Sequence, residues 1–136
     1  MSSAEPAVPA LDHVQVAAPP GCEPEARRFY GELLGLPEMD KPEPLRGAGG
    51  AWFALDGAGS ALHIGVDAEF APARKAHPAL RVTAPVLEEL AVRLRDGGAP
   101  VTWDDRLPGF RRFYTADPWG NRLELLAVNV GDTTGL

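Results

Sequence analysis

Apolar and polar residues follow one another in a pattern that occurs twice along the chain. In the first half, residues 23–34 have the spacing of a helix, with a core stripe of Phe29, Leu33 and Leu36 and with Gly35 near its end. The flanking segments predict strands at residues 11–16, 38–41, 51–55 and 61–66, a loop at 42–50 and a turn at 56–59. The first half therefore predicts the order strand, helix and three strands.

The second half repeats this order after a linker at residues 67–76, in which we predict one helical turn. Pro85 opens a helix that ends at Gly97, and its apolar side is predicted to consist of Val86, Leu87, Leu90 and Leu94. The remaining segments predict strands at residues 77–82, 100–103, 110–115 and 122–128, with a turn at 117–120.

This repetition predicts an internal duplication of a βαβββ module, and so an α+β fold. The modules span residues 10–66 and 77–128, and together they form a single domain over residues 10–128. A chain of 136 residues suits one domain with its own core. We expect residues 1–9 and 129–136 to be flexible termini. Because each helix covers one face of its sheet, the opposite face must be buried elsewhere or line a cavity.

Charge and composition limit the partners and the compartment. The net charge of −6 argues against nucleic acid, because phosphate backbones are bound by basic surfaces. No stretch has the length and hydropathy of a membrane span, and the first residues lack the features of a signal peptide. Cys22 is the single cysteine, so no internal disulfide is possible. We therefore expect a cytoplasmic protein that binds a small molecule and no membrane.

The three histidines and one carboxylate lie at comparable places in the repeat. His13 is on the first strand of module one and His63 on its last strand. His77 begins the first strand of module two, and Glu124 lies on its last strand. If the two halves join face to face, the four side chains can converge. Three imidazoles and a carboxylate suit one divalent ion, which could be Zn, Ni, Fe, Co or Mn.

Strand alternation supports this interpretation. The two neighbours of His63 and the two neighbours of Glu124 are aliphatic, so they point to the core while His63 and Glu124 point the other way. A single histidine on a strand is more often a surface or core residue than a ligand. Four ligand-type residues at equivalent positions are harder to explain in that way, and they favour a metal site.

Further residues can line the same cavity. By alternation, Gln15 shares the strand face of His13, and Arg81 shares that of His77. An arginine there could hold an anionic group, although a solvated surface charge is an equal alternative. Trp52 and Tyr114 could form apolar walls, although aromatic side chains more often belong to the core. We assign these four residues to substrate binding.

Three segments carry a family resemblance. They are residues 11–14 (LDHV), residues 26–36 (ARRFYGELLGL) and residues 117–125 (DPWGNRLEL). Together they resemble the vicinal oxygen chelate superfamily, which includes glyoxalases, dioxygenases and bleomycin-resistance proteins, and the resemblance covers residues 10–128. It implies that the paired modules form a cupped mixed sheet around a metal held by His13, His77 and Glu124. His63 stands where glyoxalase-like members often have a glutamate, so the chain departs there from the usual ligand set.

The resemblance also implies a shared chemistry, in which a divalent ion binds two neighbouring oxygens of a small substrate. We expect an isomerase or lyase reaction with Glu124 moving a proton, and a homodimer, because members of the superfamily often pair modules across a dimer. One alternative is an extradiol-type Fe(II) dioxygenase, against which the additional histidine His63 counts. A second is a metal-free protein that sequesters an antibiotic, against which the intact ligand set counts. A fosfomycin-type transferase with a thiol cosubstrate is a third.

Overall fold

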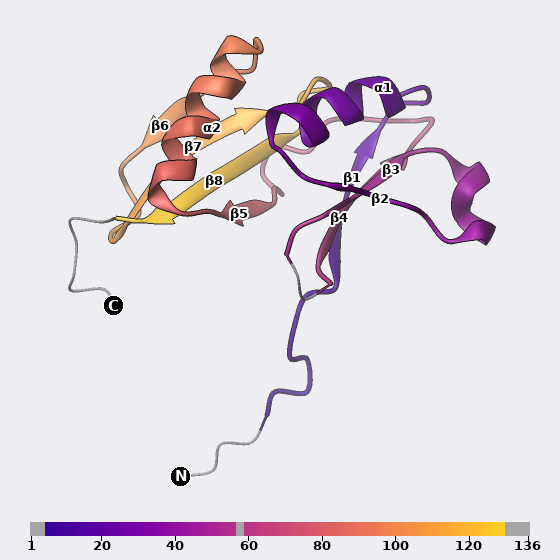
Figure 1. The fold of residues 1–136 in the computed structure, drawn as a ribbon, viewed down its shortest axis with the longest axis horizontal. Helices are drawn as coiled ribbons and strands as arrows, with labels where there is room; N and C mark the ends of the chain where they lie inside the picture. The colour runs from indigo at the N-terminus through magenta and orange to yellow at the C-terminus, as the bar shows by residue number, and fades with distance from the viewer. Residues whose placement is uncertain (1–4, 57–58, 130–136) are drawn as a thin grey trace.

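The chain folds into two modules, each a four-stranded mixed sheet with a helical segment on one face (Figure 1). The computed structural model describes residues 5–56 and 59–129. Module one consists of β1 (His13–Ala18), α1 (Glu23–Ala26), η1 (Arg27–Leu33), β2 (Glu38–Met39), η2 (Glu43–Ala48), β3 (Ala51–Ala54) and β4 (Ala61–Val66). Module two consists of β5 (Ala79–Arg81), α2 (Ala84–Asp96), β6 (Thr102–Asp104), β7 (Phe110–Ala116) and β8 (Arg122–Val128).

The two sheets have the same topology, which confirms the duplication and the α+β fold. Their strand orders are β1-β4-β3-β2 and β5-β8-β7-β6. In each sheet the first strand pairs in parallel with the last, and the other pairs are antiparallel. Among the described residues no strand pairing joins one sheet to the other, so β1 and β5 each have one unpaired edge.

The first helix departs from the predicted pattern. After the single α-helical turn of α1, with Pro24 in its first turn as helix starts allow, the chain continues as the π-helix η1. A π-helix has more residues per turn than an α-helix, so it turns different side chains towards the core. Tyr30 and Leu34 are therefore buried, whereas Leu33 and Leu36 are only partly buried. Gly35, with φ of 77°, ends the helix where predicted.

Several other predicted elements also need correction. Residues 43–48 form the 3-10 helix η2 rather than a loop, and residues 67–76 contain no helical turn. On α2, Val86 is 38% exposed, and the buried side consists of Leu87, Leu90, Ala91 and Leu94. The strand β6 begins at Thr102, two residues after its predicted start. The predicted turn at 56–59 and the predicted flexible termini fall partly outside the described residues.

The strand β5 begins at Ala79, so His77 precedes it rather than lying in it. Pro78 has no amide hydrogen and cannot donate to a sheet. Its carbonyl does accept a hydrogen bond from the Glu124 amide, at 3.0 Å. The segment before β5 therefore stays beside β8, and this keeps the backbone of His77 near Glu124.

Within the described residues, no helix is both long and apolar enough to cross a membrane.

A buried hydrogen-bond network ties the two modules together. The Tyr30 hydroxyl on η1 donates to Oδ2 of Asp117, which follows β7, at 2.7 Å. Asn121 donates to the same carboxylate oxygen and to the Ala17 carbonyl on β1, both at 2.8 Å. Burial, with the nearby Asp117 charge, raises the pKa of Tyr30 well above its usual value. The hydroxyl therefore remains a donor, and the resemblance motifs at 26–36 and 117–125 bind each other directly.

We expect Tyr30→Phe to lower the free energy of unfolding by about 1–3 kcal/mol, because the ring remains while the buried Asp117 carboxylate loses a donor. The measurement is chemical denaturation. Tyr114→Phe is the matched control, since no described residue hydrogen-bonds its hydroxyl, and it should change stability by less than about 0.5 kcal/mol. Equal stability of the two variants would show that the hydrogen bond to Asp117 contributes nothing.

Candidate metal centre

The open face of the first sheet carries a row of polar and aromatic side chains. The strand register pairs Gln15 with His63 and His63 with Trp52, so these three residues form one row across β1, β4 and β3. His13 lies two residues before Gln15 and so shares its face. The neighbours of His63 on β4 are almost fully buried on the helix side. The predicted alternation on β4 is therefore confirmed.

The second sheet repeats this arrangement. Ala79, Glu124 and Tyr114 form one row across β5, β8 and β7. His77 lies two residues before Ala79, as His13 lies two residues before Gln15. Glu124 thus occupies the position of His63, and His77 that of His13. The register of the two sheets therefore confirms that the two pairs of ligand candidates occupy equivalent positions in the repeat.

The first pair consists of stacked rings. The imidazoles of His13 and His63 lie 4.1 Å apart with an angle of 15° between their planes. On its other face His63 stacks on Trp52, at 3.8 Å and 1°. Burial, and then the neighbouring His13, lower the pKa of His63, which favours the neutral imidazole that a metal requires. The His13 Nδ1 lies 2.8 Å from an Asp12 oxygen, which leaves its Nε2 available.

The second pair brings two lone pairs towards each other. The His77 Nδ1 lies 2.9 Å from the Lys75 carbonyl, and a carbonyl can only accept, so Nδ1 carries a proton. In a neutral imidazole Nε2 then carries a lone pair, and it lies 3.0 Å from Oε1 of Glu124. An ionised carboxylate also offers only lone pairs there. The contact therefore requires a cation between the two atoms, either a proton or a metal ion.

The other oxygen of Glu124 is held by a chain of charges. Arg112 donates to Oε2 of Glu124 at 3.1 Å and also to Oδ1 of Asp104 at 3.1 Å. Arg106 donates to the other Asp104 oxygen at 2.7 Å. The hydrogen bonds from Arg106, followed by those from Arg112, hold the pKa of Asp104 well below its usual range. Glu124, although only 5% exposed, is thus fixed with Oε1 directed at His77.

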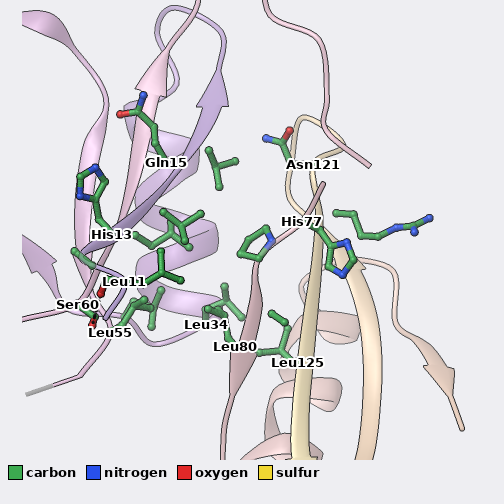
Figure 2. A pocket seen from close by; sticks show the side chains of 18 of the residues that line it. Leu11, His13, Gln15, Leu34, Leu55, Ser60, His77, Leu80, Asn121 and Leu125 are labelled. Carbon is green, nitrogen blue, oxygen red and sulfur yellow. Dashed lines mark hydrogen bonds between the residues drawn. The ribbon is translucent and has the colours of Figure 1, made fainter. Parts of the chain in front are cut away.

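The two pairs do not converge within one chain. No three His, Cys, Asp or Glu side chains among residues 5–56 and 59–129 lie close enough together to hold a metal ion. Figure 2 shows His13 and His77 at opposite sides of the space between the modules, with leucine side chains between them. The four side chains of one chain therefore do not gather around one position, and their role as metal ligands stays a prediction. The modules are related differently from the face-to-face arrangement that the predicted convergence assumed.

The space between the modules is an apolar groove of about 840 Å³. It runs along the unpaired edges of β1 and β5. Its walls combine leucines from the helix side of both sheets with His13, Gln15, His77 and Arg81 from the open faces. Figure 2 shows Leu34, Leu55, Leu80 and Leu125 directed into it. Leu34 and Leu125 belong to the hydrophobic core of the chain, so the groove extends into that core.

The residues predicted to bind substrate are divided between the two open faces. Gln15 lies flat over Gly65, where a Cβ would come within 2.7 Å of its side chain. Trp52 stacks on His63, and Tyr114 is the cross-strand neighbour of Glu124. The Arg81 guanidinium lies 5.2 Å from the centre of the Phe110 ring, one row away from Glu124.

The sequence did not single out the groups that orient the ligand candidates. Asp12 and the Lys75 carbonyl fix the imidazoles of His13 and His77, and Arg112 fixes Glu124. Alternation could have indicated Arg112, because it lies two residues before Tyr114 on the same strand face. A backbone carbonyl leaves no trace in the sequence.

The chain is similar in fold to several solved structures. The chain is 47% identical to a glyoxalase family protein from Bacillus anthracis, over 88% of this chain and 95% of that one, with a TM-score of 0.81. A glyoxalase/dioxygenase from Nostoc punctiforme is 19% identical over 95% and 98% of the two chains, with a TM-score of 0.75. The fosfomycin resistance protein FosX from Listeria monocytogenes is 17% identical over 90% and 95%, with a TM-score of 0.69.

The sequence matches no protein-family model and no curated protein. The likenesses at 19% and 17% identity show the fold alone, and their names cover different activities. The likeness at 47% identity extends over nearly the whole of both chains, and it agrees with the duplicated βαβββ topology. The chain therefore belongs to the glyoxalase family of the vicinal oxygen chelate superfamily.

Proposed function

We propose that this protein is a metal-dependent enzyme whose single divalent ion is held by His13 and His63 of one copy and by His77 and Glu124 of a second copy. These donors would hold Zn, Ni, Fe, Co or Mn, and the bound ion would supply chelation of two neighbouring oxygens of a small substrate for an isomerase or lyase reaction. We also propose that the protein acts in the cytoplasm.

The contact between His77 and Glu124 carries this proposal. Two atoms that both offer lone pairs lie 3.0 Å apart, and Nδ1 of the imidazole is already committed to a carbonyl. An imidazole nitrogen and a carboxylate oxygen are donors that such an ion takes, so Nε2 of His77 and Oε1 of Glu124 would hold it. A ligating histidine typically donates its other N–H to a carbonyl or carboxylate, as His77 and His13 do. The donor chemistry therefore fits a metal.

The repeat supports a site shared between two copies. Each module offers two donors in equivalent positions, and one chain keeps the two pairs apart. A twofold axis that brings the first pair of one copy to the second pair of the other would create two identical sites. The groove and the unpaired edges of β1 and β5 are surfaces that a second copy would cover.

The residues around the site have distinct roles in this proposal. When bound, the ion supplies Lewis-acid stabilisation of charge that develops on the substrate oxygens. Oε1 of Glu124 would leave the ion to accept a proton from the substrate and would then return it, while Arg112 keeps Oε2 engaged. Trp52 fixes the plane of His63 from one side. Tyr114, beside Glu124 on the open face, contacts the substrate.

A metal-free binding protein is the second candidate, and the apolar groove favours it. Its volume of about 840 Å³ falls in the range of pockets that enclose drug-sized molecules. In that function the groove would hold an apolar ligand between the modules, and Glu124, which does not line the groove, would not affect its affinity.

We expect elemental analysis of the protein, purified without added metal or chelator, to give about one metal ion per chain. Glu124→Ala and His13→Ala should each lose it, because each removes one ligand. The control Glu89→Ala changes an exposed carboxylate on α2 and should retain the metal. Loading should weaken as the pH falls, because a proton competes for the space between His77 and Glu124. A metal content that the two ligand variants leave unchanged would contradict the ligand set.

A mixing experiment tests the shared site. His63→Ala and Glu124→Ala chains carry different affinity tags, are co-expressed, and are isolated as mixed dimers. In each mixed dimer, one site combines His13 and His63 of the Glu124→Ala chain with His77 and Glu124 of the His63→Ala chain, and the other site lacks two ligands. These dimers should therefore hold about half of the wild-type metal per chain. Dimers of either variant alone should hold almost none. A wild-type protein that is monomeric, or mixed dimers without metal, would show that the site is not shared.

A further inference from the structure

A second concavity lies on the open face of module two, next to the row that contains Glu124. It has a volume of about 430 Å³, and Tyr114 and Thr102 contribute to its lining. It is also lined by three arginines, Arg74, Arg106 and Arg122, and by the carboxylate of Asp104. The lining is therefore cationic, in a chain whose net charge is −6.

The charges in this pocket are unequally paired. Asp104 is fully engaged, by Arg106 on one oxygen and by Arg112 on the other. Over the described ranges, neither Arg74 nor Arg122 has a carboxylate within salt-bridge distance. Both arginines are exposed, so their guanidinium groups are accessible to an anion that enters the pocket.

Arg122 is placed by the fold close to the candidate metal ligand. It lies two residues before Glu124 on β8, and its amide donates to the Ala73 carbonyl at 2.9 Å. That hydrogen bond holds the segment with Arg74 against the start of β8. The guanidinium groups of Arg122 and Arg112 each lie 5.3 Å from the centre of the Tyr114 ring. Tyr114 is thus flanked by two guanidinium groups.

We propose that Arg122, Arg74 and the Tyr114 hydroxyl form a subsite for an oxyanionic group of the substrate, a carboxylate or a phospho group. This proposal rests on the proposed function, since it places the charged end of the substrate beside Glu124. A guanidinium offers two parallel N–H donors that match two oxygens of such a group, and the phenol adds a third donor. No described residue hydrogen-bonds that hydroxyl, so it is available. The substrate is then an anion whose two chelating oxygens lie within reach of its charged group.

The test uses metal-free full-length protein at constant ionic strength, because salt screens arginine charges. Inorganic phosphate and acetate are the probes, and the Nε–H resonances of the arginines report binding by NMR. We expect at least one probe to shift Arg122 in a saturable manner, and the probe that saturates identifies the anionic group. Arg122→Gln and Arg74→Gln should each weaken this binding, Arg122→Gln by about tenfold. The control Arg95→Gln removes the same charge from an exposed position on α2 and should leave binding unchanged.

The outcomes separate this inference from the proposed function. Metal loading of Arg122→Gln should equal that of the wild type, because Arg122 is not a ligand. A protein that loads metal but binds neither phosphate nor acetate saturably would overturn the subsite and leave the metal proposal standing. Equal anion binding by Arg122→Gln and Arg95→Gln would also overturn it. Saturable anion binding by a protein that takes up no metal would support the subsite while the proposed enzyme fails.

Discussion

The arrangement of the molecule depends on the buried carboxylate of Asp117. It receives hydrogen bonds from the Tyr30 hydroxyl, the Asn121 side chain, and the amides of Trp119 and Asn121. A carboxylate that is 5% exposed is costly unless its lone pairs are satisfied, and one of these donors belongs to the other module. Separation of the modules would therefore remove one of the donors on which this buried charge depends. Asn121 adds a second tie, to the carbonyl of Ala17 on β1.

This tie explains why the histidine pairs are apart. It joins the helix side of module one to the turn that precedes β8, and so it fixes the helix-covered faces on the inside of the molecule. His63 and Glu124 then lie on separate sheets, and the groove between the modules is lined by His13 and His77, one from each pair. A duplicated fold held in this way presents two matching halves of a site. Neither half contains more than two of the four donors.

The alternation and periodicity of apolar residues in the sequence predicted most of the strands and the placement of the ligand candidates on them. Alternation placed His63 and Glu124 on the faces opposite their aliphatic neighbours, and the repeat placed the two pairs at equivalent positions, as the register confirms. The π-helical turns of η1 were missed, because an α-helical period puts Leu33 in the core where the structure buries Leu34. The separation of the pairs was missed as well, since it depends on the contact between Tyr30 and Asp117, which lie 87 residues apart. Periodicity contains no information about how distant segments meet.

The lone-pair contact of His77 has a consequence for how Glu124 acts. One oxygen of the carboxylate is bound by Arg112, and the other is directed at an atom that cannot donate unless it is protonated. The two oxygens are therefore not equivalent. Arg112, fixed in turn by Asp104, holds one of them permanently, so any exchange of a proton or a metal ion takes place at Oε1. The hydrogen bonds from Arg106 to Asp104 and from Arg112 to Asp104 and Glu124 thus make a symmetric carboxylate directional, although none of these three residues contacts His77.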